Sequence, residues 1–236
     1  GSLFLYLEKT MTTYLEIINE VLRDVNEVPL KAENFSSARG IQDFVKKAVN
    51  RAYMDIVVAS AEWPWLLNTT GTDGNITTEV TKGKRYYALG EHHNLDLDTI
   101  LLTDSEGTSF DLDFRAYDEW HHHERTQETT EEDEGRPRKI FKHPGSALYG
   151  LSPVPDSTYT LTYTKWDPAT KFTADTDVIP FAAQYENVLI NRALFYTWMF
   201  RENLDHANMV NKTFDTQLLN MMKQLVISKL VTMRAR

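Results

Sequence analysis

The sequence contains no cysteine. Disulfide bonds, thiolate metal sites and a cysteine nucleophile are therefore excluded, and the fold has to be held together by its core. Long apolar runs are also missing, because no stretch approaches the roughly 20 residues needed to cross a bilayer. We therefore expect neither membrane insertion nor secretion.

Positive charge is scarce, with 25 Lys and Arg residues against 34 Asp and Glu residues and a formal net charge of -9. Binding to nucleic acid draws its affinity from many Lys and Arg contacts to phosphates, so this balance argues against a broad DNA-gripping surface. DNA could pass nearby without being bound specifically. Hydrophobic residues make up 42% of the chain, which predicts a genuine core.

The motifs that usually carry enzyme chemistry are missing too. The sequence has no Gly-rich phosphate loop, no Gly-x-Ser-x-Gly elbow and no His-Glu-x-x-His pattern. Phosphoryl transfer, serine hydrolysis and zincin proteolysis thus lack their expected scaffolds. We expect no enzyme activity and no cofactor.

A histidine cluster is the one feature that suggests metal chemistry. His121-His122-His123 is flanked by Glu119 and Glu124, and imidazole and carboxylate both bind zinc. Adjacent residues on a helix point about 100° apart, so only His121 and Glu124 would face one ion. The pair His92-His93 falls in a predicted turn. A polar surface helix is the preferred interpretation, and a metal-dependent enzyme is a remote alternative.

Apolar residues recur at the helical period near the start of the chain. Thr13 followed by Glu16 has the spacing of a capping box, which predicts a first helix over about residues 13–26. A second, long helix resumes at Ile41. We expect Trp63-Pro64-Trp65 to end it, because proline disfavours helix in the residue before it.

The helical pattern returns near the end of the chain. After Pro180 a wide apolar face predicts one helix, and residues 204–230 carry a second apolar set. The polar residues 201–203 separate the two. We expect an antiparallel pair.

The middle of the chain carries strand and turn signals instead. Threonine-rich, β-branched segments over residues 66–114 are separated by turn sequences. A short surface helix is predicted at 115–125 and an acidic loop at 128–134. Strands return at 139–142 and at 159–166, where apolar residues alternate with threonines as in a half-buried strand.

These patterns predict an α+β fold, an antiparallel helical bundle from the N- and C-terminal helices with a β-rich insertion between them. Because the chain starts Gly1-Ser2 and Met11 precedes a well-formed helix start, residues 1–10 are interpreted as an expression-derived or flexible N-terminus. The remaining predicted parts are 11–66 and 178–230 for the helical core, 67–177 for the insertion with its short helix and acidic loop, and 231–236 for a C-terminal arm.

Three segments follow one another in an order that resembles a known family. They are Pro153-Val154-Pro155-Asp156-Ser157-Thr158-Tyr159-Thr160-Leu161-Thr162-Tyr163, then Asp175-Thr176-Asp177-Val178-Ile179-Pro180, then Tyr185 to Tyr196 with Arg192-Ala193-Leu194. A proline-aspartate turn, a strand, an acidic loop with proline and a long helix in this order resemble tailed-bacteriophage head-to-tail adaptor (connector) proteins of the tail tubular protein A type. The early helices fit as well, so the resemblance spans most of residues 13–230 and is weakest over 68–150.

The resemblance implies a non-enzymatic structural protein of the virion. Its copies would form a ring, of twelve, that binds the portal protein and a downstream tail or nozzle protein. A central channel would let DNA pass during ejection. The implied location is the neck of the virion, after synthesis in the cytoplasm of the bacterial host. Another phage neck, tail completion or baseplate protein is the alternative.

Two charged segments are candidates for roles in such an assembly. Lys223, Lys229, Arg234 and Arg236 are basic on an acidic chain, and we expect them to dock on an acidic portal surface; a solvated, frayed helix end is the alternative. The acidic residues would form a channel wall that repels DNA phosphates, with a solvated loop as the alternative. These residues are Glu128, Glu131, Glu132, Asp133 and Glu134.

Overall fold

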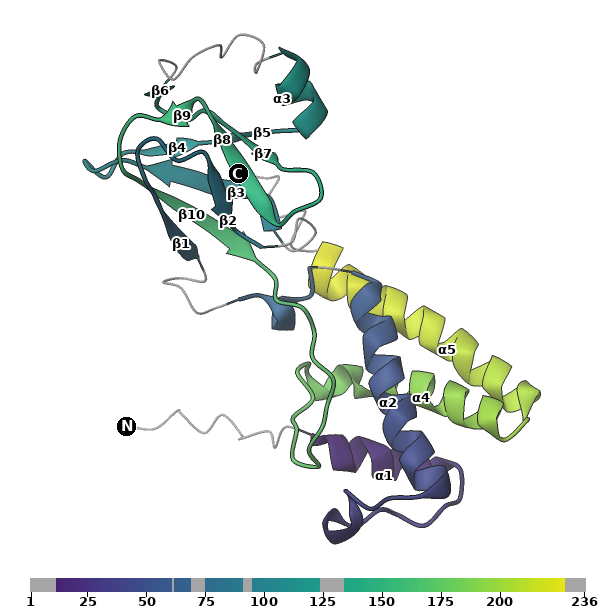
Figure 1. Cartoon of the computed structure of the whole chain (residues 1–236). Coiled ribbons are helices and arrows are strands. Elements are labelled where there is room, and N and C mark those ends of the chain that lie inside the picture. Colours follow the sequence, from purple (N-terminus) through teal and green to yellow (C-terminus); the bar gives the residue numbers. More distant parts are fainter. Residues whose placement is uncertain (1–11, 61, 69–74, 91–94, 124–133, 228–236) are drawn as a thin grey trace, which may run out of the picture. The chain divides into compact units, whose positions relative to one another are not determined.

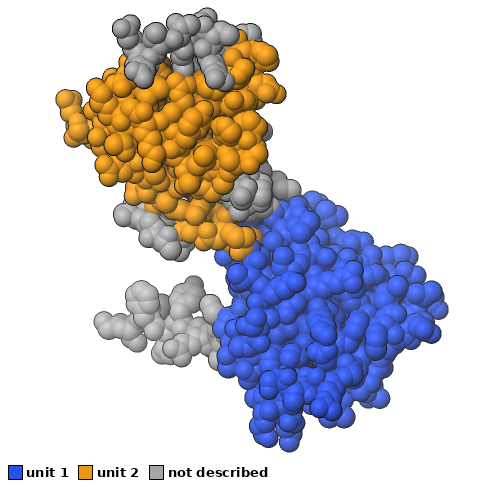
Figure 2. Space-filling model, viewed as in Figure 1, with its two compact units in different colours: residues 1–65, 169–236 blue, residues 66–168 orange. Residues whose placement is uncertain are grey.

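The computed structural model of the chain describes residues 12–60, 62–68, 75–90, 95–123 and 134–227. Helices and strands are both abundant, so the predicted class of mixed α and β structure is confirmed. The chain divides into two compact units (Figures 1 and 2). Residues 1–65 and 169–236 form the helical unit, and residues 66–168 form the strand unit.

The helical unit takes its helices from both ends of the chain (Figure 1). Its main helices are α1 (Tyr14–Asp24), α2 (Gly40–Val58), α4 (Glu186–Phe200) and α5 (Leu204–Met222). Shorter pieces are the 3-10 turns η1 (Ala32–Asn34), η2 (Pro64–Leu66) and η5 (Ala183–Tyr185), and the π-helical turn η6 (Lys223–Ile227). Helix α4 packs against α1, α2 and α5, so it lies at the centre of the unit.

Helix α1 begins as its sequence predicts. The Thr13 hydroxyl accepts a hydrogen bond from the Glu16 backbone N–H at 3.3 Å, and the Glu16 carboxylate accepts one from the Thr13 backbone N–H at 2.6 Å. This reciprocal capping box satisfies two N–H groups that a helix start leaves without partners. The buried face of α1 then packs into the core through Tyr14, Ile17, Ile18, Val21 and Leu22.

Helix α2 stops earlier than predicted. It ends at Val58, before Trp63-Pro64-Trp65, so the expected end point is wrong by several residues. Trp63 is fully buried, and its indole N–H donates to the Ile56 carbonyl at 2.9 Å. The two indoles stack with ring centroids 4.6 Å apart. These tryptophans therefore cover the end of α2 by packing, after the chain has already left the helix.

The described residues of the strand unit form three sheets of mostly short strands, which Figure 1 labels. One sheet has the order β1-β10-β3-β4, a second has β2-β8-β7-β5, and β6 pairs with β9. The bounds are β1 (Ile76–Val80), β2 (Tyr86–Ala88), β3 (Leu95–Thr103), β4 (Ser109–Asp111), β5 (Asp113–Arg115), β6 (Glu134–Gly135), β7 (Lys139–Lys142), β8 (Leu148–Ser152), β9 (Val154–Pro155) and β10 (Tyr159–Lys165), with helix α3 at Tyr117–His123.

Strand β10 shows the predicted alternation. Tyr159, Leu161 and Tyr163 are buried, while Thr160 is exposed between them. Strand β10 lies between β1 and β3, antiparallel to both. Its inward side chains join a core cluster shared with the second sheet, which includes Ile140 and Leu151.

The two ends of the strand unit are hydrogen-bonded to each other. The Asp167 backbone N–H donates to the Leu66 carbonyl at 2.7 Å, and the Asn68 N–H donates to the Lys165 carbonyl at 2.9 Å. Leu67 and Trp166 form an antiparallel bridge between these bonds. The chain therefore enters and leaves the strand unit as a paired ribbon.

The strand unit ends earlier than the predicted insertion of residues 67–177, because residues 169–177 group with the helical unit. The Asn50 carboxamide both donates to the Phe172 carbonyl, at 3.0 Å, and accepts from its N–H, at 2.8 Å. The Phe172 ring packs on Tyr14 and Tyr53. These contacts fix residues 169–177 against α1 and α2.

Candidate assembly surfaces

Arg192 ties three helices together. Its guanidinium on α4 donates to Asp55 of α2 at 2.6 Å, to Asn211 of α5 at 2.6 Å and to the Tyr196 hydroxyl at 3.3 Å. Tyr196 in turn donates to Asp55. Burial, and then the Asp55 carboxylate, raise the pKa of Tyr196. Arg192, the arginine of the adaptor-like segment, therefore links α2, α4 and α5 from a partly buried position.

Asp177 organises the segment that leads back to the helices. Its carboxylate accepts from the backbone N–H groups of Thr173, at 2.5 Å, and Ala174, at 2.8 Å, and these bonds lower the pKa of Asp177. Its carbonyl accepts from the Tyr14 N–H at 2.7 Å. The same segment thus closes a turn and holds the start of α1.

The other adaptor-like residues also have structural positions. In the strand unit Pro155 lies in β9, and the Tyr159 hydroxyl donates to Asp156 at 2.6 Å. Burial and this carboxylate raise the pKa of Tyr159 to about 12. In the helical unit Pro180 lies exposed just before η5. Three further residues of the adaptor-like pattern in this unit are buried, namely Tyr185, Ala193 and Leu194.

The turn between α4 and α5 exposes a cluster of apolar side chains. Met199, Phe200 and Leu204 have exposed fractions of 44%, 56% and 58%. Phe200 stacks on Phe44 of α2 with ring centroids 4.2 Å apart, and Arg201 donates to the Val25 carbonyl at 2.9 Å.

Arg201 also forms an ion pair with Glu27. Val28, which follows Glu27 in the sequence, has a side chain that is 73% exposed. We call Val28, Met199, Phe200 and Leu204 the tip patch. Sequence analysis missed it, although two apolar residues directly before the polar break at 201–203 were a signal.

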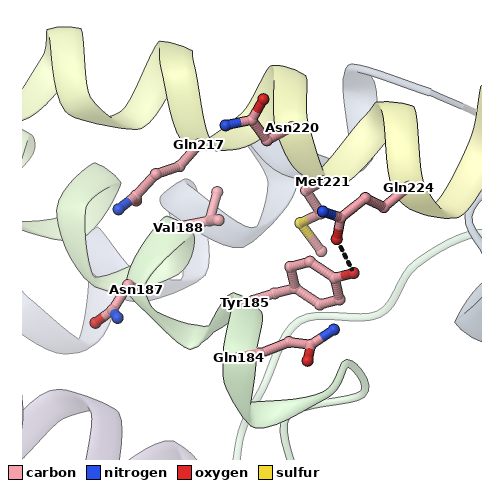
Figure 3. A pocket seen from close by; sticks show the side chains of 8 residues that line it. All are labelled: Gln184, Tyr185, Asn187, Val188, Gln217, Asn220, Met221 and Gln224. Carbon is pink, nitrogen blue, oxygen red and sulfur yellow. Dashed lines mark hydrogen bonds between the residues drawn. The ribbon is translucent and has the colours of Figure 1, made fainter.

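A groove of about 350 Å³ lies beside the start of α4 and the end of α5 (Figure 3). Five of its eight lining residues carry carboxamides, and none is charged. The Tyr185 hydroxyl donates to Gln224 at 2.8 Å, and the Asn191 carboxamide donates to Gln217 at 2.8 Å. We call this the carboxamide groove; its lining is Gln184, Tyr185, Asn187, Val188, Gln217, Asn220, Met221 and Gln224.

The predicted surface helix at 115–125 corresponds to α3, which begins at Tyr117 and is described up to His123. Trp120 of α3 stacks on Phe141 of β7 with ring centroids 3.9 Å apart. His121 faces the Tyr117 and Trp120 rings. Among the described residues, which exclude Glu124 and residues 91–94, no group of three His, Cys, Asp or Glu side chains is placed to hold a metal ion.

Most of the predicted charged sites lie outside the described residues. Lys223 is described and exposed at the start of η6, whereas Lys229, Arg234 and Arg236 fall beyond the described part. Glu134 is described in β6 and pairs with Lys82 at 3.2 Å. The rest of the acidic run, Glu128 and residues 131–133, falls in an undescribed stretch. The portal and channel roles of all these residues stay predictions.

Comparison with known families decides the identity of the chain. The model of the SU10 adaptor protein family matches residues 12–235, nearly the whole sequence. The chain belongs to the SU10 adaptor protein family. The predicted resemblance to phage head-to-tail adaptors is thereby confirmed, while the tail tubular protein A type stays a prediction. No curated protein matches the sequence significantly.

Membership makes this adaptor a structural protein of a bacteriophage, in a family that is structural rather than enzymatic. The match covers both the helical and the strand unit, so both belong to the adaptor. None of the helices in the described part of the chain is long and apolar enough to cross a membrane.

Proposed function

We propose that this adaptor assembles into a ring at the neck of the virion, binds the portal, and joins it to the tail around a channel for DNA. The helical unit, an antiparallel bundle, is the hub of each copy, and the strand unit is an insertion that reaches a tail component. Copies in a head-to-tail contact that closes by rotation form a ring, and many modest contacts then add together.

The observation that carries this proposal is the distribution of exposed apolar side chains. Of nine large hydrophobic residues exposed among the described residues, eight belong to the helical unit. Clustered exposed apolar groups mark contact surfaces, because their burial in an interface removes them from water. The tip patch contains four of these eight residues and is the proposed contact between neighbouring copies.

The charged segments fit the two ends of such a ring. Lys223, Lys229, Arg234 and Arg236 are basic residues on a chain of net charge -9, and they are proposed to meet an acidic surface of the portal. The acidic chain as a whole suits a channel wall, since negative groups repel the phosphates of passing DNA and prevent adhesion.

The first experiment measures the mass of the full chain with and without purified portal protein, by native mass spectrometry. We expect a complex that holds many adaptor copies per portal, twelve if the family resemblance carries that far. An adaptor that stays monomeric and does not bind the portal would disprove the proposal.

A second experiment tests the tip patch. The double variant Met199→Ser/Leu204→Ser removes two apolar side chains from the proposed contact, so the assembly constant is expected to fall roughly tenfold or more. The control is Leu148→Ser, which changes the exposed apolar residue of the strand unit. Equal assembly by both variants would place the subunit contact elsewhere.

A further inference from the structure

Helix α5 carries a row of exposed side chains on the side away from the core of the helical unit. Its inner side is buried through Ala207, Val210, Phe214 and Met221. On the opposite side, positions alternately four and three residues apart follow the heptad spacing at which two helices pair. All six residues at these positions are exposed. We call them the α5 stripe: Asp205, Met209, Lys212, Thr216, Leu219 and Lys223.

The α5 stripe contains apolar surface that gains from being covered. Met209 and Leu219 have exposed fractions of 60% and 57%. The Thr216 hydroxyl donates to the Lys212 carbonyl at 3.1 Å, so its hydrogen bond is made within its own helix. Covering Thr216 therefore leaves no polar group unsatisfied. Burial of the two large side chains removes them from water and favours association.

The α5 stripe is complementary to a reversed copy of itself. Its six members lie nine, five and two residues on either side of Phe214. When two helices pair antiparallel, each a position faces a d position of the partner. A two-fold axis at the level of Phe214 produces these layers, and each of them occurs twice in the pair. The facing residues are Asp205 and Lys223, Met209 and Leu219, and Lys212 and Thr216.

Charge favours the antiparallel direction over the parallel one. In a parallel pair each stripe residue would face its own counterpart, so Lys212 would meet Lys212 and Lys223 would meet Lys223. In the antiparallel pair Asp205 meets Lys223, and the long side chain of Lys212 reaches Asp215, the exposed neighbour of Thr216. Among the described residues, Asp205, Lys212 and Lys223 form no ion pair, so a second copy can supply their partners.

We propose that two copies of the free adaptor pair antiparallel through the α5 stripe. Such an isologous contact closes at two copies, whereas all copies of a cyclic ring point the same way, so the pair is a state of the protein before ring assembly. It uses none of the tip patch. Lys223 is also among the residues proposed to meet the portal, so the pair opens before that contact forms; this last step rests on the proposed function.

Crosslinking tests the register, and the absence of natural cysteine leaves no competing thiol. In the proposed pair position 209 of one copy faces position 219 of the other, while the two copies of either position are at least about 15 Å apart along the helix. Met209→Cys/Leu219→Cys is therefore expected to give a covalent dimer on oxidation, and neither single variant is. Dimers of either single variant would indicate a parallel pair, and a double variant that stays monomeric would reject the contact.

Charge exchange tests the facing residues. Asp205→Lys and Lys223→Asp each place like charges at both ends of the pair, so dimerisation measured by analytical ultracentrifugation is expected to weaken roughly tenfold. An equimolar mixture of the two variants restores opposite charges at both ends and should dimerise again. Glu20→Lys, the same kind of change at an exposed position of α1, is the matched control and should dimerise as the wild type does.

The remaining outcomes separate this pair from the proposed ring. The tip-patch variant Met199→Ser/Leu204→Ser is expected to keep the dimer while losing the ring. A wild type that is monomeric at every concentration rejects the pair, as does a mixture of charge variants that shows no recovery. If the charge variants dimerise normally but bind the portal less tightly, the stripe faces the portal instead. A dimer that forms although no ring assembles on the portal would reject the proposed function and leave the pair standing.

Discussion

The helical unit and the strand unit differ in what they bury and what they expose. The strand unit encloses a continuous apolar cluster between its sheets and exposes one large apolar residue among those described, Leu148. The helical unit combines an apolar core with a polar network around Arg192 and leaves the tip patch in solvent. A unit that buries nearly all of its large apolar side chains can fold as an independent module. A unit that exposes apolar side chains is suited to contact with other chains, because such a contact removes them from water.

The largest expected effect tests the independence of the strand unit. Leu161→Ala removes a fully buried side chain from β10 and should cost about 2–5 kcal/mol of unfolding free energy. Hydrogen exchange should show lost protection in β1, β3 and β10, with α1 and α2 unchanged. Thr160→Ala, exposed on the same strand, should be nearly silent. Equal loss of protection in the helices would mean that the two units unfold together.

The second-largest loss of stability is expected from a glycine substitution in the second sheet. A Cβ atom at Gly150 of β8 would overlap the Phe141 ring, the ring on which Trp120 of α3 stacks. Gly150→Ala should therefore cost about 1–3 kcal/mol through overpacking. We expect the near-UV circular dichroism of the Trp120 environment to change as α3 loosens. Gly145→Ala, with open space around its Cβ position, is a control for substitution of a glycine, although its positive φ adds strain of its own.

Arg192→Leu tests the polar network of the helical unit. It leaves Asp55 without its cationic partner, and we expect a loss of about 2 kcal/mol in denaturant unfolding. The variant Asp55→Asn/Arg192→Leu should recover part of that loss, because no unpaired carboxylate is left. The loss of unfolding free energy in the double variant is compared with the sum of the losses in the two single variants. A double-variant loss equal to or larger than that sum would show that the network does not depend on this ion pair.

The smallest expected effect concerns Asp177. Its pKa is lowered in the folded chain, so its ionised form contributes stability that is complete above the unfolded pKa of about 3.9 and is lost as pH falls through the lower folded value. Asp177→Asn should cost about 1 kcal/mol at pH 7 and progressively less below pH 4. A stability difference that stays constant from pH 7 to pH 3 would contradict the role of the charge.

How far the sequence predicts each unit depends on the range of the interactions involved. The α1 capping box and the burial pattern of β10 follow from neighbouring residues, and both predictions were confirmed. The placement of β10 between β1 and β3 depends on contacts between distant segments, for which a single sequence holds no local signal. The end of α2 was misplaced because tryptophan packing, and not only proline, shapes that region.

The candidate surfaces also depend on contacts between residues far apart in the sequence, so the sequence predicted them only in part. The family-pattern residues could be selected from the sequence, but their roles could not: Arg192 and Asp177 hold the helical unit together through partners far away in the chain. The carboxamide groove joins Gln184 and Asn187 to Asn220 and Gln224, and no periodicity connects these positions before the fold brings them together. Asn and Gln are common, uncharged residues, so the composition of the sequence does not indicate that they form a groove.

The ribbon that pairs Leu66 with Asp167 and Asn68 with Lys165 has an evolutionary consequence. Because the chain leaves the strand unit beside the point where it enters, any loop or domain whose ends meet can replace everything between without stretching the helices. Length and shape can therefore diverge in this region at little cost to the helical unit. Adaptors that share the helices could carry modules of different size at the same junction.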